Sequence, residues 1–210
     1  MVKMLRNVQV KRIKVFLLLG VLTALSITFA AKTIVGDEPT IDYTLNDHFE
    51  GDTLQHYWTV EGIPPKVANS WVFIDPPGPY TIQAPDKKQG YGIWEFYIKP
   101  EGEEAGDVWI RLIDNLHNVQ NALCLSISTI GRANFTATVL GDGKVIEKLI
   151  APCLKDKEYR LKIIYLFDKV EFFINDELKW TCTENIPAKE LFVQILPHAM
   201  RIDYVKAWRQ

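Results

Sequence analysis

Four side chains on two predicted strands within residues 90–113 are of the types that bind sugars. Apolar and polar residues alternate along both strands, which places Glu95 and Tyr97 opposite the apolar face of one strand and Trp109 and Arg111 opposite that of the other. An aromatic ring stacks on the apolar side of a sugar ring, while carboxylate and guanidinium groups hydrogen-bond to its hydroxyls. If the two strands are neighbours in one sheet, these four residues form a glycan-binding cleft.

The same residues also have a structural interpretation. Glu95 and Arg111 would form an ordinary cross-strand ion pair, with Trp109 covered by a loop. The outward residues of the strand predicted at 134–140, Asn134, Thr136 and Thr138, would add polar groups to the face under either interpretation. The sequence leaves both interpretations open.

The elements that would carry these side chains are short strands separated by turns. Period-two alternation recurs after residue 90, and no stretch beyond residue 31 keeps a helical period. Gly141-Asp142-Gly143 predicts a tight hairpin between strands at 134–140 and 144–150. Further strands are predicted at 123–129, 158–167, 170–174, 178–183, 191–196 and 200–208. This spacing without crossover helices predicts an all-β, antiparallel sandwich of two sheets.

Four motifs together resemble the concanavalin A-like lectin/glucanase superfamily, and in particular the laminarinase- and lichenase-type glycoside hydrolases. The motifs are Asp47–Leu54 followed by Trp58, Tyr91–Pro100, Val170–Glu177 and Met200–Trp208. The resemblance runs from about residue 45 to residue 208. It implies a jelly-roll sandwich over residues 45–210, with a polysaccharide or other glycan as the partner.

The catalytic motif of those hydrolases is missing from this sequence. The resemblance implies a Glu-x-Asp-x-x-Glu strand in the middle of one sheet, whose outer glutamates lie about 5 Å apart in a retaining glycosidase. No such motif occurs in the chain. If residues 123–129 form the equivalent strand, Cys124, Ser126 and Thr129 stand at the three acidic positions. We therefore expect no hydrolysis of the family type.

The resemblance also implies a metal ligand. Asp203 stands where many relatives bind a structural calcium ion, and calcium takes carboxylate and carbonyl oxygens. The alternative is that Asp203 pairs with Arg201 or faces solvent. No other cofactor is expected.

The three cysteines lack the spacing of a zinc site. In an oxidising compartment Cys153 and Cys182 are the preferred disulfide pair, because they flank the same run of strands, and Cys124 would remain free. Three free thiols are the alternative.

The first 31 residues predict export from the cytoplasm. Five basic residues and no acidic one occur in residues 1–14, and the 16 residues 15–30 are mostly apolar. This is the pattern of a signal peptide, although an uncleaved signal anchor stays possible in a run shorter than the roughly 20 residues of a spanning helix. Residues 32–44 would be a linker. The chain is expected outside the cell or at its surface, with membrane contact only through an uncleaved leader.

The charge of the remaining chain excludes one class of partner. Removing the five basic residues of the leader leaves 19 basic against 26 acidic residues, a net charge near −7. Such a surface repels phosphate backbones, so nucleic acid is not an expected partner.

The function expected from these features is that of an exported, non-catalytic, lectin-like carbohydrate-binding protein. A divergent glycoside hydrolase acting on a β-glucan-type polysaccharide is one alternative. A structural cell-surface or filament subunit that associates with itself through an exposed edge strand is the other.

Overall fold

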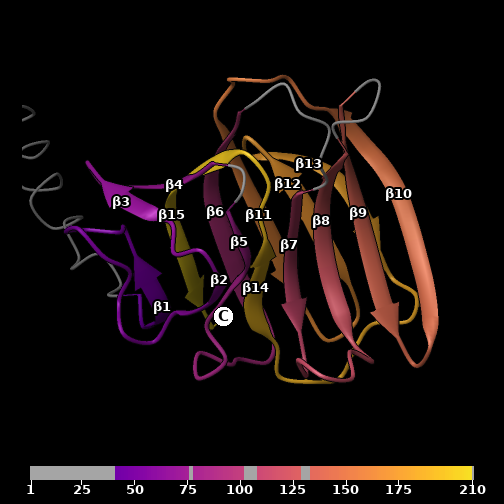
Figure 1. The fold of residues 1–210 in the computed structure, drawn as a ribbon. Helices are drawn as coiled ribbons and strands as arrows, with labels where there is room; N and C mark the ends of the chain where they lie inside the picture. The colour runs from indigo at the N-terminus through magenta and orange to yellow at the C-terminus, as the bar shows by residue number, and fades with distance from the viewer. Residues whose placement is uncertain (1–40, 76–77, 102–107, 129–132, 210) are drawn as a thin grey trace, which may run out of the picture. The chain divides into compact units, whose positions relative to one another are not determined.

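The computed structural model describes residues 41–75, 78–101, 108–128 and 133–209, which form an all-β structure (Figure 1). Fifteen strands and no helix occur in this part of the chain, so none of its elements is a helix that could cross a membrane. All strand pairs are antiparallel, and the strands form two sheets. The predicted leader, residues 1–31, lies outside the described residues.

The eight-stranded sheet, sheet A, contains both ends of the domain. Its order is β13 (Glu177–Cys182), β12 (Val170–Ile174), β11 (Tyr159–Tyr165), β6 (Gly92–Pro100), β15 (Met200–Trp208), β4 (Trp71–Ile74) and β3 (Lys66–Ala68). The first strand, β1 (Tyr43–Asp47), pairs with the last one, β15, and it begins inside the segment predicted as a linker.

The seven-stranded sheet, sheet B, faces the viewer in Figure 1. Its order is β10 (Lys144–Pro152), β9 (Asn134–Gly141), β8 (Ala122–Ser128), β7 (Val108–Ile113), β14 (Phe192–Leu196), β5 (Pro79–Gln83) and β2 (Thr59–Gly62). Asp142 and Gly143 both have positive φ, at 47° and 73°, as a two-residue type I′ turn requires. The hairpin predicted between β9 and β10 is therefore confirmed.

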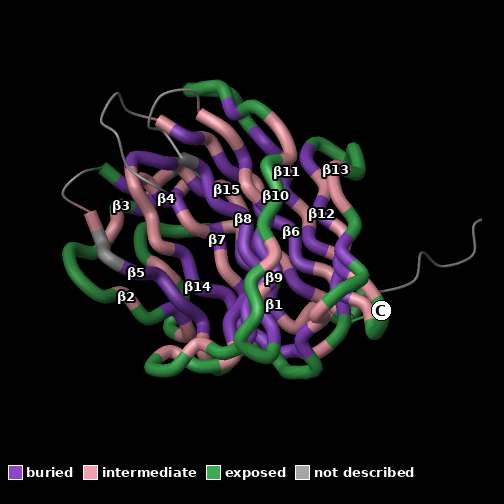
Figure 2. The backbone as a smooth tube through the Cα atoms, turned by 90° about the vertical axis from the view of Figure 1, so that its right-hand side faces the viewer, coloured by how far each residue is buried: buried purple, intermediate pink, exposed green. Residues whose placement is uncertain are grey.

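The core lies between the two sheets, where one face of each is buried (Figure 2). Sheet A contributes the fully buried rings of Trp94 and Phe96, and sheet B contributes Ile110, Leu125 and Phe135. Burying one such side chain contributes about 1.5–3 kcal/mol to folding. The alternation in the sequence therefore predicts correctly which residues of β6 and β7 point inward.

Two of the motifs have a structural explanation in this core. The Asp47 carboxylate, 3% exposed, accepts hydrogen bonds from the amide of Phe49 at 2.7 Å, the hydroxyl of Tyr57 at 2.9 Å and the indole of Trp58 at 2.7 Å. Gly92, in the second motif, lies against the backbone of β15: a Cβ at this position would be 2.4 Å from the carbonyl oxygen of Trp208. Asp47 and Gly92 therefore have structural roles in these two motifs.

Candidate functional site

The four residues predicted to form one cleft lie on two different faces of the molecule. Glu95 and Tyr97 are on β6 in sheet A, whereas Trp109 and Arg111 are on β7 in sheet B. The outward direction of all four side chains was predicted correctly, but the assumption that β6 and β7 are neighbours is wrong. Consecutive strands of a two-sheet sandwich can belong to opposite sheets, and alternation within a strand carries no information about which sheet holds it.

The outer face of sheet B carries a polar row that crosses six strands. The residues paired directly across the sheet, from β10 to β5, are Glu147, Thr138, Cys124, Arg111, Gln194 and Gln83. Most of this row is neutral, and Arg111 stands at its middle. We call this row, together with the Trp109 row beside it, the sheet B face.

Arg111 is half-buried and bonded only to neutral groups among the described residues. Its Nη2 donates to Oε1 of Gln194 at 2.7 Å, and Nε2 of Gln194 donates to Oε1 of Gln83 at 3.2 Å. The Arg111 Nε is buried without a partner, and no described carboxylate lies within ion-pair distance. Burial lowers the pKa of the Arg111 guanidinium, which nevertheless stays protonated at neutral pH.

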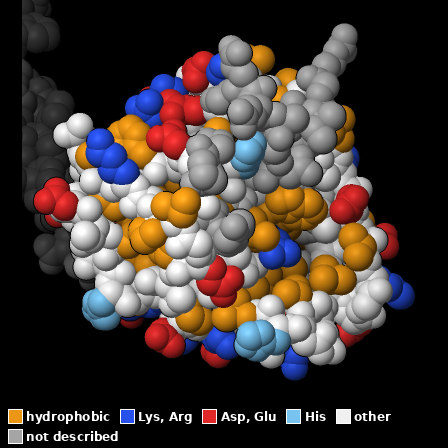
Figure 3. All heavy atoms as spheres, in the orientation of Figure 1, with side chains coloured by type: hydrophobic (Ala, Val, Ile, Leu, Met, Phe, Trp, Pro, Cys, Tyr) orange, Lys and Arg blue, Asp and Glu red, His pale blue; other side chains and the backbone are white. Residues whose placement is uncertain are grey.

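The second row of the sheet B face contains the aromatic residue expected of a sugar site. Trp109 is half-buried and pairs with Ser126 of β8 on one side and Leu196 of β14 on the other. Thr136 of β9 continues the row beyond Ser126. Figure 3 looks onto this face and shows a hollow near its middle, where a basic side chain lies among hydrophobic side chains.

One end of the sheet B face is closed by an apolar cluster. Its buried members are Ile113, Ala122 and Phe192, and Leu116, Val119 and Leu140 pack against them. Two of these residues belong to the loop 114–121, which the Asp114 carboxylate holds by accepting a 2.7 Å hydrogen bond from the Asn121 side chain. Burial would raise the pKa of Asp114, but the hydrogen bonds from Asn121 and Gln120 outweigh it and lower that pKa. These hydrogen bonds tie the two ends of the loop together beside the apolar cluster.

The strand next to β7 on the sheet B face, β8, presents no carboxylate in its described part. Cys124 and Ser126 point outward there, at two of the positions that the resemblance assigns to acids, while Thr129 lies outside the described residues. Burial raises the pKa of the Cys124 thiol to about 12, so the group is neutral at pH 7. Neither side chain can act as the acid or the carboxylate nucleophile of a glycosidase.

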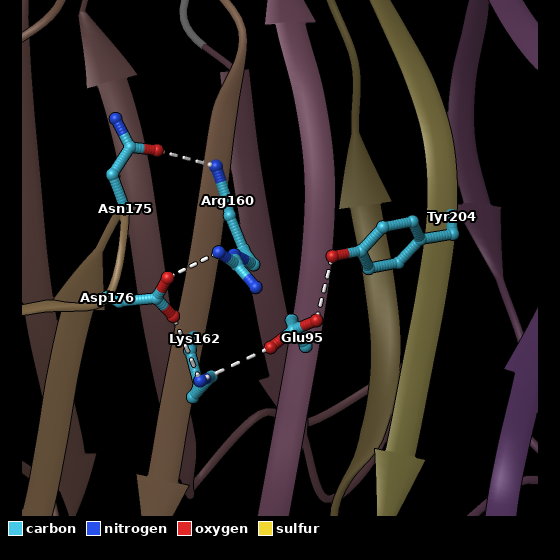
Figure 4. Close-up of polar contacts among 6 residues, drawn as sticks. All are labelled: Glu95, Arg160, Lys162, Asn175, Asp176 and Tyr204. Atoms are coloured by element: carbon cyan, nitrogen blue, oxygen red, sulfur yellow. Dashed lines mark hydrogen bonds and ion pairs between the residues drawn. The ribbon is translucent and has the colours of Figure 1, made fainter.

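The outer face of sheet A is a network of paired charges (Figure 4). Glu95, 8% exposed, accepts a 2.7 Å hydrogen bond from the Tyr204 hydroxyl and forms a 3.3 Å ion pair with Lys162. Lys162 also pairs with Asp176, which in turn binds Arg160. The predicted ion pair of Glu95 with Arg111 is therefore wrong in its partner, because Lys162 of β11 is the residue opposite Glu95.

Tyr97 belongs to the same network. Its hydroxyl donates to Glu158 at 2.6 Å, and its ring stacks on Tyr204 with centroids 5.6 Å apart. The two tyrosines line a shallow, open hollow together with Glu158, Arg160 and Asn175. Since the charged groups already satisfy one another, we assign this face to the structure of the sheet.

Asp203 lies at an irregularity in the pairing of β15 with β6. Burial raises its pKa, helped by the charge of Glu158 and opposed by His48 and Lys206. Arg201 pairs with Glu101 instead, so the suggested pairing of Asp203 with Arg201 is wrong. No three His, Cys, Asp or Glu residues gather into a metal-binding group in the described part of the chain, and calcium binding at Asp203 stays a prediction.

All three cysteines are buried free thiols in the structure, so the predicted disulfide between Cys153 and Cys182 is not formed. The Cys182 thiol donates to the carbonyl oxygen of Glu184 at 3.3 Å, and Cys153 lies beside the Tyr159 hydroxyl. Cys153 and Cys182 flank the same run of strands in the sequence, but the fold does not bring their sulfur atoms into a bond. The alternative of three free thiols describes this structure.

Sequence analysis missed two residues of the sheet B face, Gln83 and Gln194. Both are buried polar residues, at 3% and 6% exposure, on strands whose apolar residues alternate weakly. No local signal marks them, because their role depends on lying next to Arg111 in the sheet.

Comparison with known proteins places the fold. No protein-family model and no curated protein matches the chain. A β-glucanase from Bacillus licheniformis superposes with a TM-score of 0.64 at 10% sequence identity, over 81% of this chain and 100% of that one. Laminarinase from Rhodothermus marinus gives a TM-score of 0.66 at 11% identity, over 81% and 98% of the two chains. Laminarinase from Flavobacterium sp. UMI-01 gives 0.64 at 16% identity, over 80% and 100%.

These likenesses confirm the expected jelly-roll β-sandwich fold, which this chain shares with the three solved structures. Identities this low show the fold alone, since one fold can support unrelated functions.

Proposed function

We propose that the chain binds polysaccharide on the sheet B face without cleaving it by the two-carboxylate mechanism. The fold is shared with proteins named as β-glucanase and laminarinase, which act on β-glucans. The predicted leader supports export, so the binding would take place outside the cell or at its surface. N-terminal sequencing of the exported chain tests that location.

The observation that carries the proposal is the chemistry of β8. A retaining glycosidase needs two carboxyl groups about 5 Å apart across the scissile bond. At the middle of the sheet B face, the described residues offer a neutral thiol at Cys124 and a hydroxyl at Ser126. Glu147 lies at the edge strand β10, where it accepts a 3.5 Å hydrogen bond from Thr138. One edge carboxylate does not make a catalytic pair.

The remaining groups of the face suit the binding of a glycan. Trp109 offers a half-exposed ring for stacking, and Thr136 offers a hydroxyl farther along the same row, beyond Ser126. Arg111, which is half-buried, offers a planar group of the kind that matches a pair of sugar hydroxyls, and the buried amide of Gln194, itself bonded to Gln83, holds it in place. A binding protein needs these groups and no acid pair.

A divergent hydrolase is the second candidate, because the structural relatives named above are glucanases. It would require a carboxylate pair other than the family's. Release of reducing ends from a β-glucan by the purified chain would favour this candidate over the first.

The experiment that tests binding is a pull-down of the purified chain with a panel of insoluble polysaccharides. A Trp109→Ala variant should lose about two- to tenfold in affinity, since stacking on an aromatic ring contributes about 0.5–1.5 kcal/mol. A Phe167→Ala variant is the matched control, because Phe167 is an aromatic residue 79% exposed in the turn between β11 and β12. Equal binding by both variants would refute the assignment to the sheet B face, and no binding to any polysaccharide would refute the proposed function.

A further inference from the structure

Arg111 differs from the other arginines of the described strands in having no acidic partner. Arg160 on β11 pairs with Asp176, and Arg201 on β15 pairs with Glu101 at 2.7 Å. Arg111 instead donates to the neutral amide of Gln194. In a domain with an excess of acidic residues, this absence of a counter-charge at the middle of one face requires an explanation.

The surroundings of Arg111 do not neutralise its charge. The two residues paired with it across the sheet are Cys124, a protonated thiol, and Gln194, an amide. Its Nε is buried and unpaired, so the guanidinium is both partly removed from water and short of acceptors. A half-buried cation without a partner is costly to the folded protein, and a bound anion would remove that cost.

A guanidinium presents five N–H donors in a planar fork that fits the two oxygens of a carboxylate or of a sulfate. The described protein uses one of these donors in the bond to Gln194. Figure 3 shows a hollow on this face at which a basic side chain lies among hydrophobic ones. Trp109 lies two residues away on the same outward face of β7.

We propose that the glycan bound on the sheet B face is acidic, and that Arg111 binds the carboxylate or sulfate group of a sugar that lies against Trp109. This inference rests on the proposed function and names its class of ligand. The net charge near −7 opposes the binding of a polyanion in general, so an acidic glycan needs a local cation, and Arg111 supplies one on this face.

The test compares three soluble probes by isothermal titration calorimetry: polygalacturonate, which carries carboxylates, dextran sulfate, which carries sulfates, and laminarin, a neutral β-glucan. An Arg111→Gln variant removes the charge and keeps a planar polar group, while Arg111→Lys keeps the charge and loses the fork. Arg160→Gln is the matched control, because it changes the net charge equally on the outer face of sheet A. Circular dichroism and thermal unfolding establish that each variant is folded.

The expected result is that at least one acidic probe binds at least about tenfold more tightly than laminarin, and that Arg111→Gln removes this advantage while Arg160→Gln keeps it. The acidic probe that binds identifies carboxylate or sulfate as the group recognised. Equal binding of laminarin and the acidic probes, unchanged by Arg111→Gln, would overturn the inference and leave polysaccharide binding intact. Failure of all three probes and of the insoluble panel would overturn both.

Discussion

Replacing Asp47 by alanine is expected to destabilise the domain more than any other single change of a carboxylate in the opening motif. The substitution removes the acceptor of three hydrogen bonds, two of them from the buried amide of Phe49 and the buried indole of Trp58. A buried donor left unpaired costs about 1–3 kcal/mol. Tyr57 is partly exposed and can turn to water, so we expect a total loss of about 2–5 kcal/mol in the free energy of unfolding.

Equilibrium unfolding in urea, followed by tryptophan fluorescence and circular dichroism, measures this loss. With a slope of about 2 kcal/mol per molar urea, the midpoint should fall by roughly 1–2.5 M. Asp52→Ala is the matched control, since Asp52 lies in the same motif and is exposed, and its effect should stay within about 0.5 kcal/mol. Asp47→Asn keeps one carbonyl acceptor and should fall between the two.

A loss below about 1 kcal/mol for Asp47→Ala, or a loss equal to that of Asp52→Ala, would refute this reasoning. A double-mutant cycle with Trp58→Phe separates the contribution of the hydrogen bond between Trp58 and Asp47 from that of the other two bonds to Asp47. The coupling between Asp47 and Trp58 should be about 1 kcal/mol or more, as for residues that share a buried hydrogen bond. A coupling of zero would show that the bond to the indole contributes nothing to stability.

Three further predictions concern other parts of the domain. Gly92→Ala should cost about 1–3 kcal/mol, because the new methyl group would overlap the carbonyl oxygen of Trp208, whereas Gly90→Ala, with nothing within 4 Å of its Cβ, should be nearly neutral; thermal unfolding of the two variants checks this. The three cysteines should react slowly with Ellman's reagent in the native protein and rapidly in urea, since all are buried, and rapid native labelling would contradict the burial. If calcium binds at Asp203, the melting temperature should fall on adding a chelator, and Asp203→Asn should abolish that difference; no response to the chelator would rule out a stabilising ion.

The sequence by itself determined the class of the fold and the direction of individual side chains. Alternation along β6 and β7 is a local property of the extended chain, so it identified Trp94 and Ile110 as inward and Trp109 and Arg111 as outward. The turn at Asp142 and Gly143 was equally local, because two consecutive positive φ angles restrict the residue types. The absence of the family's acidic motif also needed no structure.

Only the tertiary structure decided which outward residues meet. Arg111 bonds to Gln194, 83 residues away in the chain, and Gln194 bonds to Gln83 across 111 residues. Glu95, predicted beside Arg111, lies instead on the other sheet and pairs with Lys162. The period of a strand fixes the face of each side chain, but the neighbour of each strand is chosen by long-range packing of the whole core. For that reason local patterns predicted the outward direction of Trp109 and Arg111 and could not predict the rest of their face.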